Sequence, residues 1–268
     1  MSRLHTEYYQ QGDANKPALV LIHGWGAHGG VWQSVLPALT NNFNVTCIDL
    51  PGHGRSKQVS HKDIAGWADA ALEVAPEKAI WLGWSLGGLV AQQVASVATN
   101  RVEKLILIAS TPKFVKSDDW AEAVDEKTFR DFHAEVIRDP HASLLRFIAI
   151  QTRGSKTASE DSRLLRRTLL QPEPSATGLD SGMKLLLETD LRKLIKNITC
   201  PVLVVTGERD TLIPELAARQ ISNLFTDSEA VLIKQAGHAP FLSHPEQFYK
   251  AVTDFCLKSN KAYFKEAK

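Results

Sequence analysis

Three residue types that together carry out acyl transfer occur in this chain in the order serine, aspartate, histidine. Ser85 lies in the run Gly-Trp-Ser-Leu-Gly, Asp210 ends the run Gly-Glu-Arg-Asp, and His238 begins the run His-Ala-Pro. A serine hydroxyl is a poor nucleophile at neutral pH, so it needs an imidazole to take its proton and a carboxylate to fix the imidazole tautomer. The sequence therefore predicts a triad of Ser85, Asp210 and His238, with Glu208 as the alternative acid.

The serine lies where the residue pattern changes abruptly. Residues 79–82 are an apolar run typical of a strand, and residues 86–95 follow a helical pattern. A strand, a tight turn and a helix in this order hold a serine in a strained conformation with its hydroxyl at the sheet edge. Gly83 and Gly87 flank Ser85, where any Cβ would obstruct the close approach of strand and helix. The sequence therefore predicts a nucleophile elbow.

The elements that must position these residues alternate along the chain. Because βαβ alternation favours a parallel sheet, we expect an α/β fold with a mostly parallel, doubly wound sheet. Charged, helix-like sequence interrupts this alternation after the fourth strand and predicts an inserted helical cap over residues 112–188, with residues 1–111 and 189–268 forming the core. The predicted strands are 18–22, 44–50, 79–82, 102–109, 201–206 and 230–234, and the predicted core helices before the cap are 31–39, 64–75 and 86–95.

Other polar residues near the predicted strand ends have structural explanations. His23 and His28 flank a glycine-rich loop after the first strand, and neither has a partner at metal-ligand spacing. The glycines of that loop allow a tight turn that presents a backbone N–H toward a neighbouring loop, as an oxyanion site requires. We assign Asp49 to bonding the turn at 51–56 rather than to catalysis.

Composition sets outer limits on function. The chain has 268 residues, 44% of them hydrophobic, and a net charge of +1, which gives no overall attraction to nucleic acid or membrane. Residues 1–11 lack the apolar run of a signal peptide, and no later segment approaches the ~20 apolar residues of a membrane span. We therefore expect a cytoplasmic protein. Cys47, Cys200 and Cys256 form no C-x-x-C pair, and we expect buried free thiols.

Four motifs together resemble the α/β-hydrolase superfamily, over residues 15–257. They are His-Gly-Trp-Gly at 23–26, Asp-Leu-Pro-Gly-His-Gly-Arg-Ser at 49–56, the elbow at 79–90 and Gly-His-Ala-Pro-Phe-Leu-Ser-His-Pro at 237–245. More narrowly, the last two motifs are similar to the methyl ester esterases of biotin synthesis, which act on pimeloyl-[acyl-carrier protein]. This resemblance implies an esterase without metal or cofactor, and we expect a monomer.

The resemblance also implies roles for individual residues. Ser85 would be the nucleophile, Asp210 the acid and His238 the base, and the backbone N–H groups of Trp25 and Leu86 would form the oxyanion hole. The segment 146–152 is similar to the substrate-contacting stretch of those esterases. Large apolar surfaces beside the oxyanion loop and the nucleophile further favour an acyl pocket. The expected substrate-binding residues are Trp25, Trp84, Leu86, Phe147 and Gln151.

Charge is unevenly distributed in the predicted cap. Residues 118–135 hold seven acidic and two basic side chains, whereas residues 138–167 hold seven basic and three acidic ones. One explanation is a solvated helix face paired with the acidic helix before it. The resemblance favours another, in which a basic face docks an acidic acyl-carrier protein. The expected docking residues are Arg146, Arg163, Arg166 and Arg167, and Ser159 departs from the family pattern at a position where arginine is expected.

Three functions remain open from the sequence. The first is hydrolysis of the methyl ester of a carrier-bound medium-chain dicarboxylate. The second is a broader short-chain esterase, lactonase or carbon–carbon bond hydrolase that uses the same triad. The third is a non-catalytic small-molecule receptor on the same fold, against which the intact set of serine, aspartate and histidine argues. A dehalogenase or epoxide hydrolase is disfavoured, because such enzymes have aspartate where Ser85 stands.

Overall fold

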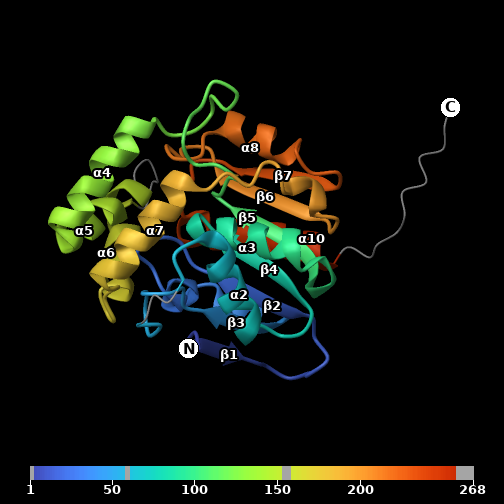
Figure 1. The fold of residues 1–268 in the computed structure, drawn as a ribbon. Coiled ribbons are helices and arrows are strands. Elements are labelled where there is room, and N and C mark those ends of the chain that lie inside the picture. Colours follow the sequence, from blue (N-terminus) through green and yellow to red (C-terminus); the bar gives the residue numbers. More distant parts are fainter. Residues whose placement is uncertain (1–2, 58–60, 153–157, 258–268) are drawn as a thin grey trace.

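The computed structural model of the chain describes residues 3–57, 61–152 and 158–257. Its strands form one seven-stranded sheet in the order β1-β3-β2-β4-β5-β6-β7 (Figure 1). The edge strand β1 pairs antiparallel with β3, and every other neighbouring pair in the sheet is parallel. The strands are β1 (Thr6–Tyr9), β2 (Ala18–Ile22), β3 (Asn44–Ile48), β4 (Ala79–Trp84), β5 (Val102–Ile108), β6 (Val202–Gly207) and β7 (Ser228–Ile233).

Helices connect these strands and cover the sheet. Figure 1 shows α2 and α3 lying side by side against one face of the sheet. The α-helices are α1 (Leu36–Leu39), α2 (Ile64–Val74), α3 (Leu86–Val97), α4 (Glu126–Arg138), α5 (Pro140–Gln151), α6 (Ala158–Leu169), α7 (Ala176–Glu188), α8 (Glu215–Ser222), α9 (Pro240–Ser243) and α10 (Pro245–Leu257). Short 3₁₀ helices are η1 (Gly29–Trp32), η2 (Thr99–Arg101) and η3 (Ile195–Asn197).

The inner strands of the sheet are buried, as their apolar sequences predict. All residues of β3, β4 and β6 are buried. Side chains on both faces of a parallel strand are covered by helices, which is why these strands are almost continuously apolar rather than alternating. The predicted doubly wound, mostly parallel sheet is therefore confirmed, and each of its six predicted strands occurs within a few residues of its expected bounds.

The prediction of one helix over residues 31–39 is wrong. The chain instead forms η1, which ends at Trp32, and then the separate four-residue helix α1. Pro37 lies in the first turn of α1. Proline has no N–H to donate to a preceding turn, so it interrupts a continuous helix but fits the start of a new one.

Two further features differ from expectation. Strand β1 was not predicted, because its four residues carry no apolar run and it lies partly exposed at the sheet edge. The cysteines are free thiols as predicted, but only Cys47 is fully buried, whereas Cys200 and Cys256 are half-buried. Burial still raises the pKa of the Cys200 thiol to about 11 and that of Cys256 to about 12, so both favour the protonated form at neutral pH.

Helices α4 to α7 follow β5 in the chain and gather beside one end of the sheet (Figure 1). The start of α7 is attached to the core, because the backbone N–H of Ser175 donates to the carbonyl of Gly52 at 2.8 Å. Gly178 packs on the same turn so closely that a Cβ there would overlap the backbone of Gly52. These contacts place the start of α7 over the loop that leaves the carboxyl end of β3.

Candidate active site

Ser85 lies in a strained turn between β4 and α3. Its backbone has φ 54° and ψ −118°, a region that residues other than glycine rarely occupy. A Cβ on Gly83 would overlap the backbone of Gly87, and a Cβ on Gly87 would overlap the carbonyl oxygens of Ile22 and His23. The start of α3 therefore approaches β4 and the end of β2 closely only because both positions are glycine. The predicted geometry of the turn is confirmed.

Hydrogen bonds from β5 hold this turn in place. The backbone N–H of Ser85 donates to the carbonyl of Ile108 at 2.9 Å, and the hydroxyl of Ser110 donates to the carbonyl of Ser85 at 2.7 Å. Strained backbone persists only where the surrounding structure over-determines it. These two bonds supply that restraint from the neighbouring strand.

His238 and Asp210 form a buried hydrogen-bonded pair. Nδ1 of His238 lies 2.9 Å from Oδ2 of Asp210, with side-chain exposures of 2% and 0%. The other carboxylate oxygen accepts the backbone N–H groups of Leu212 and Ile213 at 2.8 and 3.0 Å. An ionised carboxylate only accepts, so Nδ1 carries the imidazole proton and Nε2 keeps its lone pair. Among the described residues, no group hydrogen-bonds to Nε2.

The alternative acid Glu208 points elsewhere. Its carboxylate accepts the backbone N–H of Gln235 at 2.8 Å, and the side chain is exposed. Asp210 is thus the carboxylate that contacts the imidazole.

The fold brings Ser85, Asp210 and His238 to the same edge of the sheet. They follow the carboxyl ends of the parallel strands β4, β6 and β7. Trp84, directly before Ser85, lies against His238, with ring centroids 5.8 Å apart. Nε2 of His238 makes no hydrogen bond to Ser85, and such bonds are often long in unliganded sites and tighten when substrate binds. The arrangement can therefore support proton transfer from a serine to an imidazole.

The loop after β2 and the start of α3 adjoin the serine. Trp25 is fully buried, and its indole N–H donates to the carbonyl of Leu179 in α7 at 2.8 Å. Leu86 is the first residue of α3, so its N–H has no acceptor within the helix. A Cβ on Gly24, beside Trp25, would lie 3.2 Å from the Cβ of Ser85, which shows how closely this loop approaches the serine.

A mostly apolar cavity of about 300 Å³ lies among α4, α5 and α7; its lining also includes Asp131, Glu135 and Arg146, and none of the three triad candidates lines it. Phe147 lines it, and its ring meets that of Trp25 nearly edge-on, with centroids 4.8 Å apart. Phe132 and Met183 line it too, and sequence reasoning missed both. The spacing of Phe129, Phe132 and Val136 on an otherwise charged helix was the available signal.

Gln151, at the end of α5, is hydrogen-bonded to the backbone of His238. Its backbone carbonyl accepts the N–H of His238 at 3.2 Å, and its side chain is 1% exposed. Within the described part of the chain, its side-chain oxygen Oε1 has no hydrogen-bond partner. A buried acceptor without a donor is a place where a substrate group can bind.

A family model described as "alpha/beta hydrolase fold" matches residues 17–245. The chain belongs to the α/β-hydrolase family. Two similar relatives are named pimeloyl-[acyl-carrier protein] methyl ester esterase. The one from Pectobacterium atrosepticum is 41% identical, covering 92% of this chain and 97% of the relative. The one from Photobacterium profundum is also 41% identical, covering 88% of this chain and 93% of the relative.

Solved structures share this fold. An esterase from Exiguobacterium antarcticum superposes with a TM-score of 0.84 at 20% identity, covering 94% of each chain. The enol-lactonase from Burkholderia xenovorans superposes with a TM-score of 0.82 at 20% identity, covering 95% of this chain and 96% of the other. At this identity the likeness concerns the α/β-hydrolase fold alone. The family and fold class predicted from the motifs are confirmed.

The histidines of the α/β-hydrolase loop regions are structural. His23 accepts the N–H of Leu50 at Nε2, 2.9 Å away, and donates from Nδ1 to the carbonyl of Gly24. Burial lowers the pKa of His23 well below its ordinary value and lowers that of His53 to about 4. Both imidazoles are therefore neutral at pH 7. Asp49 accepts the backbone N–H groups of Gly29 and Arg55, which confirms its predicted role in the turn.

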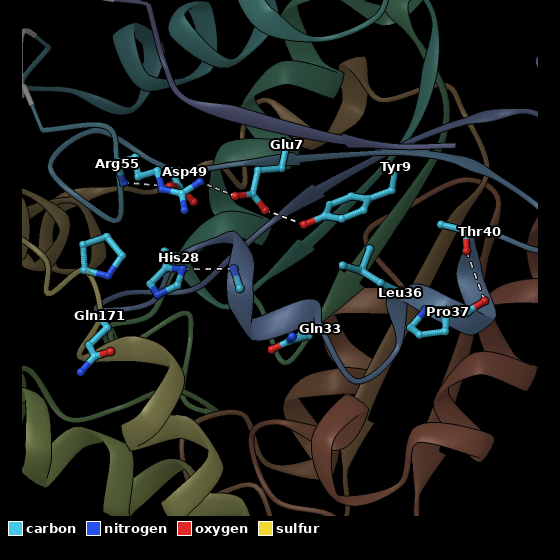
Figure 2. A pocket seen from close by; sticks show the side chains of 12 residues that line it. Glu7, Tyr9, His28, Gln33, Leu36, Pro37, Thr40, Asp49, Arg55 and Gln171 are labelled. Atoms are coloured by element: carbon cyan, nitrogen blue, oxygen red, sulfur yellow. Dashed lines mark hydrogen bonds and ion pairs between the residues drawn. The ribbon is translucent and has the colours of Figure 1, made fainter. Parts of the chain in front are cut away.

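A second cavity, of about 450 Å³, lies between β1, α1 and the loop after α6 (Figure 2). Figure 2 shows Glu7 between Arg55 and Tyr9, and its carboxylate is 2.6 Å from the guanidinium and accepts the Tyr9 hydroxyl. The Tyr9 hydrogen bond, followed by the charge of Arg55, lowers the pKa of Glu7 despite partial burial. None of the three triad candidates lines this cavity.

The four arginines expected to dock a carrier differ in their surroundings. Arg146 is ion-paired with Glu135 of α4, as the helix-pairing explanation predicts. Arg163 and Arg166 are exposed beside a surface hollow on α6, and neither has an ion-pair partner within the described part of the chain. The side chain of Arg167 lies outside the described residues. Leu165 and Leu169 on another face of α6 are buried, so the helix is amphipathic.

No helix in residues 3–57, 61–152 and 158–257 is both long enough and apolar enough to cross a bilayer. The same ranges contain no group of three or more His, Cys, Asp or Glu side chains arranged to hold a metal ion.

Proposed function

We propose that this α/β-hydrolase is a carboxylic ester hydrolase that cleaves the methyl ester of pimeloyl-[acyl-carrier protein], and that Ser85 is its nucleophile. The observation that carries the proposal is the buried hydrogen bond between His238 and Asp210 at the edge of the sheet where Ser85 lies in its strained turn. The names of the relatives, which match nearly the whole chain at about 41% identity, support the choice of substrate.

The proposed reaction has two stages. The Ser85 hydroxyl oxygen attacks the ester carbonyl while Nε2 of His238 takes its proton, and Asp210 stabilises the imidazolium. The N–H groups of Trp25 and Leu86 stabilise the oxyanion, and methanol leaves with the proton from His238. Water, deprotonated by His238, then attacks the acyl-enzyme, the bond between Ser85 and the acyl group breaks, and His238 returns the proton to the Ser85 oxygen. The acid that is released ionises to the free carboxylate. The carrier remains attached at the other end of the acyl chain.

We propose that the acyl chain lies in the apolar cavity lined by Phe147 and that α4 to α7 act as a cap, with residues 112–188 as its extent. In this proposal Trp25 and Leu86 line the serine end of the route, and the buried Oε1 of Gln151, which has no partner among the described residues, accepts a substrate donor. Apolar burial stabilises the bound chain by about 0.8 kcal/mol per methylene. A medium-length chain thus gains more from this cavity than an acetyl group does.

Replacing Phe147 with alanine should weaken binding of medium-chain methyl esters. Loss of contact with about two methylenes costs about 1–2 kcal/mol, which raises KM roughly 5- to 30-fold. KM for an acetyl ester should change little. Phe225→Ala is the matched control, because Phe225 has the same 7% exposure and lies outside the cavity lining. Equal rises in KM on both esters would place Phe147 outside the acyl site.

We also propose that Arg163 and Arg166 on α6, together with Arg146 and Arg167, dock the acidic carrier protein. Arg163 and Arg166 are exposed on α6 beside a surface hollow, where an acidic partner could contact both. Exposed charge acts mainly on the rate of encounter, and salt screens it beyond a Debye length of ~8 Å at physiological ionic strength.

Reversing Arg163 and Arg166 to glutamate should lower kcat/KM for a carrier-bound ester roughly tenfold at low salt, because electrostatic steering is lost. The salt dependence of the reaction should weaken, and turnover of p-nitrophenyl acetate should be unchanged. The control with the same change in net charge is Arg219→Glu with Lys250→Glu, on exposed positions of α8 and α10. Loss on both substrates would mean that the arginines stabilise α6, and loss on neither would support a solvated face.

Substrate preference tests the proposed function directly. Methanol release from methyl pimeloyl carrier protein should have a higher kcat/KM than hydrolysis of short aryl esters. Faster turnover of the short esters would favour a general esterase or lactonase. Binding of small molecules without any turnover would favour the receptor.

A further inference from the structure

The indole of Trp84 is hydrogen-bonded to the residue proposed as the base. Its Nε1–H donates to the backbone carbonyl of His238 at 2.8 Å, and both residues are buried. Trp84 directly precedes Ser85 in the chain. This single bond therefore connects the segment that carries the nucleophile to the segment that carries the base.

The two residues that this bond joins lie at the ends of strands that are not neighbours in the sheet. Trp84 ends β4 and His238 follows β7, and β5 and β6 lie between these strands. No strand pairing therefore sets the separation of Ser85 and His238 directly, and small displacements add up across three successive pairs. A general base acts only within hydrogen-bond reach of the proton it removes. A direct link between the two strand ends fixes that separation more tightly than the sheet alone.

The other hydrogen bonds of His238 do not set this separation. The bond to Asp210 fixes the tautomer and tilt of the ring, and the backbone N–H of His238 donates to Gln151 of α5. Neither contact connects His238 to β4. Since Nε2 has no hydrogen-bond partner among the described residues, its reach toward Ser85 depends on where the His238 backbone is held.

We propose that Trp84 is a positioning residue, whose indole N–H holds the backbone of His238 at the separation at which Nε2 takes the proton of Ser85. The inference rests on the proposed function. Two other roles compete with it, namely plain packing and lining of the acyl pocket. The apolar cavity lined by Phe147 does not include Trp84, and this favours the positioning role over the second alternative.

Trp81 provides a matched control for the packing role. It lies on the same strand and, like Trp84, is fully buried. Its indole nitrogen has no hydrogen-bond partner in the described part of the chain. Trp81→Phe and Trp84→Phe remove the same atoms, but only Trp84→Phe breaks a bond to His238.

The test compares both variants on p-nitrophenyl acetate. Trp84→Phe should lower kcat on the order of 10²-fold, because a displacement of about 1 Å in a catalytic group has that effect, with KM changed less than about twofold. The rate at which a fluorophosphonate labels Ser85 should fall by the same factor, since labelling needs the same proton transfer. Trp81→Phe should keep kcat within about threefold of wild type, because it alters packing alone.

A second variant tests the same hydrogen bond in case Trp84→Phe does not fold. Replacing Trp84 with its benzothiophene analogue keeps the shape of the ring and removes the N–H, and the same loss of kcat is expected. Unchanged kcat in this variant would overturn the proposal, as would equal losses of kcat in Trp84→Phe and Trp81→Phe. A raised KM for medium-chain esters with unchanged kcat would assign Trp84 to the acyl pocket instead. A wild-type chain that hydrolyses no ester would overturn the proposed function itself, whereas these other outcomes leave it standing.

Discussion

Replacing Ser85 with alanine should lower kcat for ester hydrolysis on the order of 10⁶-fold, the scale of loss when the nucleophile of a comparable triad is removed. In the proposed mechanism the Ser85 hydroxyl supplies the oxygen of the acyl-enzyme bond, and the alanine variant lacks this oxygen. The turn itself should persist, because the bonds from Ile108 and Ser110 act on the backbone of residue 85 rather than on its side chain. Steady-state hydrolysis of p-nitrophenyl acetate measures the loss.

The matched control is Ser96→Ala, on the same helix as the elbow. Ser96 is buried, and its hydroxyl donates to the carbonyl of Gln93, so this variant removes a buried hydroxyl away from Asp210 and His238. Its kcat should stay close to that of wild type. Comparable thermal unfolding of the two variants would show that the loss in Ser85→Ala is chemical. Residual hydrolysis above about a hundredth of wild type would contradict Ser85 as nucleophile, given the expected scale.

Replacing Asp210 with asparagine should lower kcat about 10⁴-fold, because an amide at this position favours the wrong imidazole tautomer. An asparagine can present its NH₂ group to Nδ1, which then accepts and leaves the proton on Nε2. Nε2 can no longer take the proton of Ser85. The loss should fall mainly on kcat rather than on KM, since Asp210 contacts His238 and not the acyl cavity.

Glu208→Gln is the control for this prediction. Glu208 lies two residues earlier and is exposed, and its bond to the N–H of Gln235 is available to a glutamine side-chain oxygen as well. Activity should therefore be nearly unchanged. If Asp210→Asn kept more than about a tenth of wild-type kcat while Glu208→Gln lost most of it, the acid would be Glu208 and the buried pair would be structural.

Much of the sheet was predictable from the sequence, because buried parallel strands are recognisable as short apolar runs. The positions of the three triad candidates at strand ends were predictable for the same reason. The apolar run before Ser85 and the glycines on either side of it specify strand, turn and helix through local sterics alone. Asp210 and His238 could be placed for a similar reason, because each lies in a loop that follows an apolar strand, β6 or β7. The triad assignment rests on these strand ends and stays a prediction until its variants are measured.

The features that could not be predicted from the sequence mostly depend on contacts between segments far apart in the chain. The bond from Trp84 to the carbonyl of His238 joins residues 154 positions apart, and no local pattern encodes it. Strand β1 is held mainly by its pairing with β3, and its own residues carry little strand signal. The break between η1 and α1 was missed because the apolar spacing of 31–39 outweighed the effect of Pro37 in the prediction.

Covalent labelling by a fluorophosphonate tests whether Ser85 is an activated nucleophile. Such reagents phosphonylate a serine that a neighbouring base activates, and intact-mass measurement followed by peptide mapping locates the adduct. We expect one adduct per chain, on Ser85, with labelling abolished in Ser85→Ala and slowed in Asp210→Asn. An unlabelled wild-type chain, or an adduct on another serine, would contradict it.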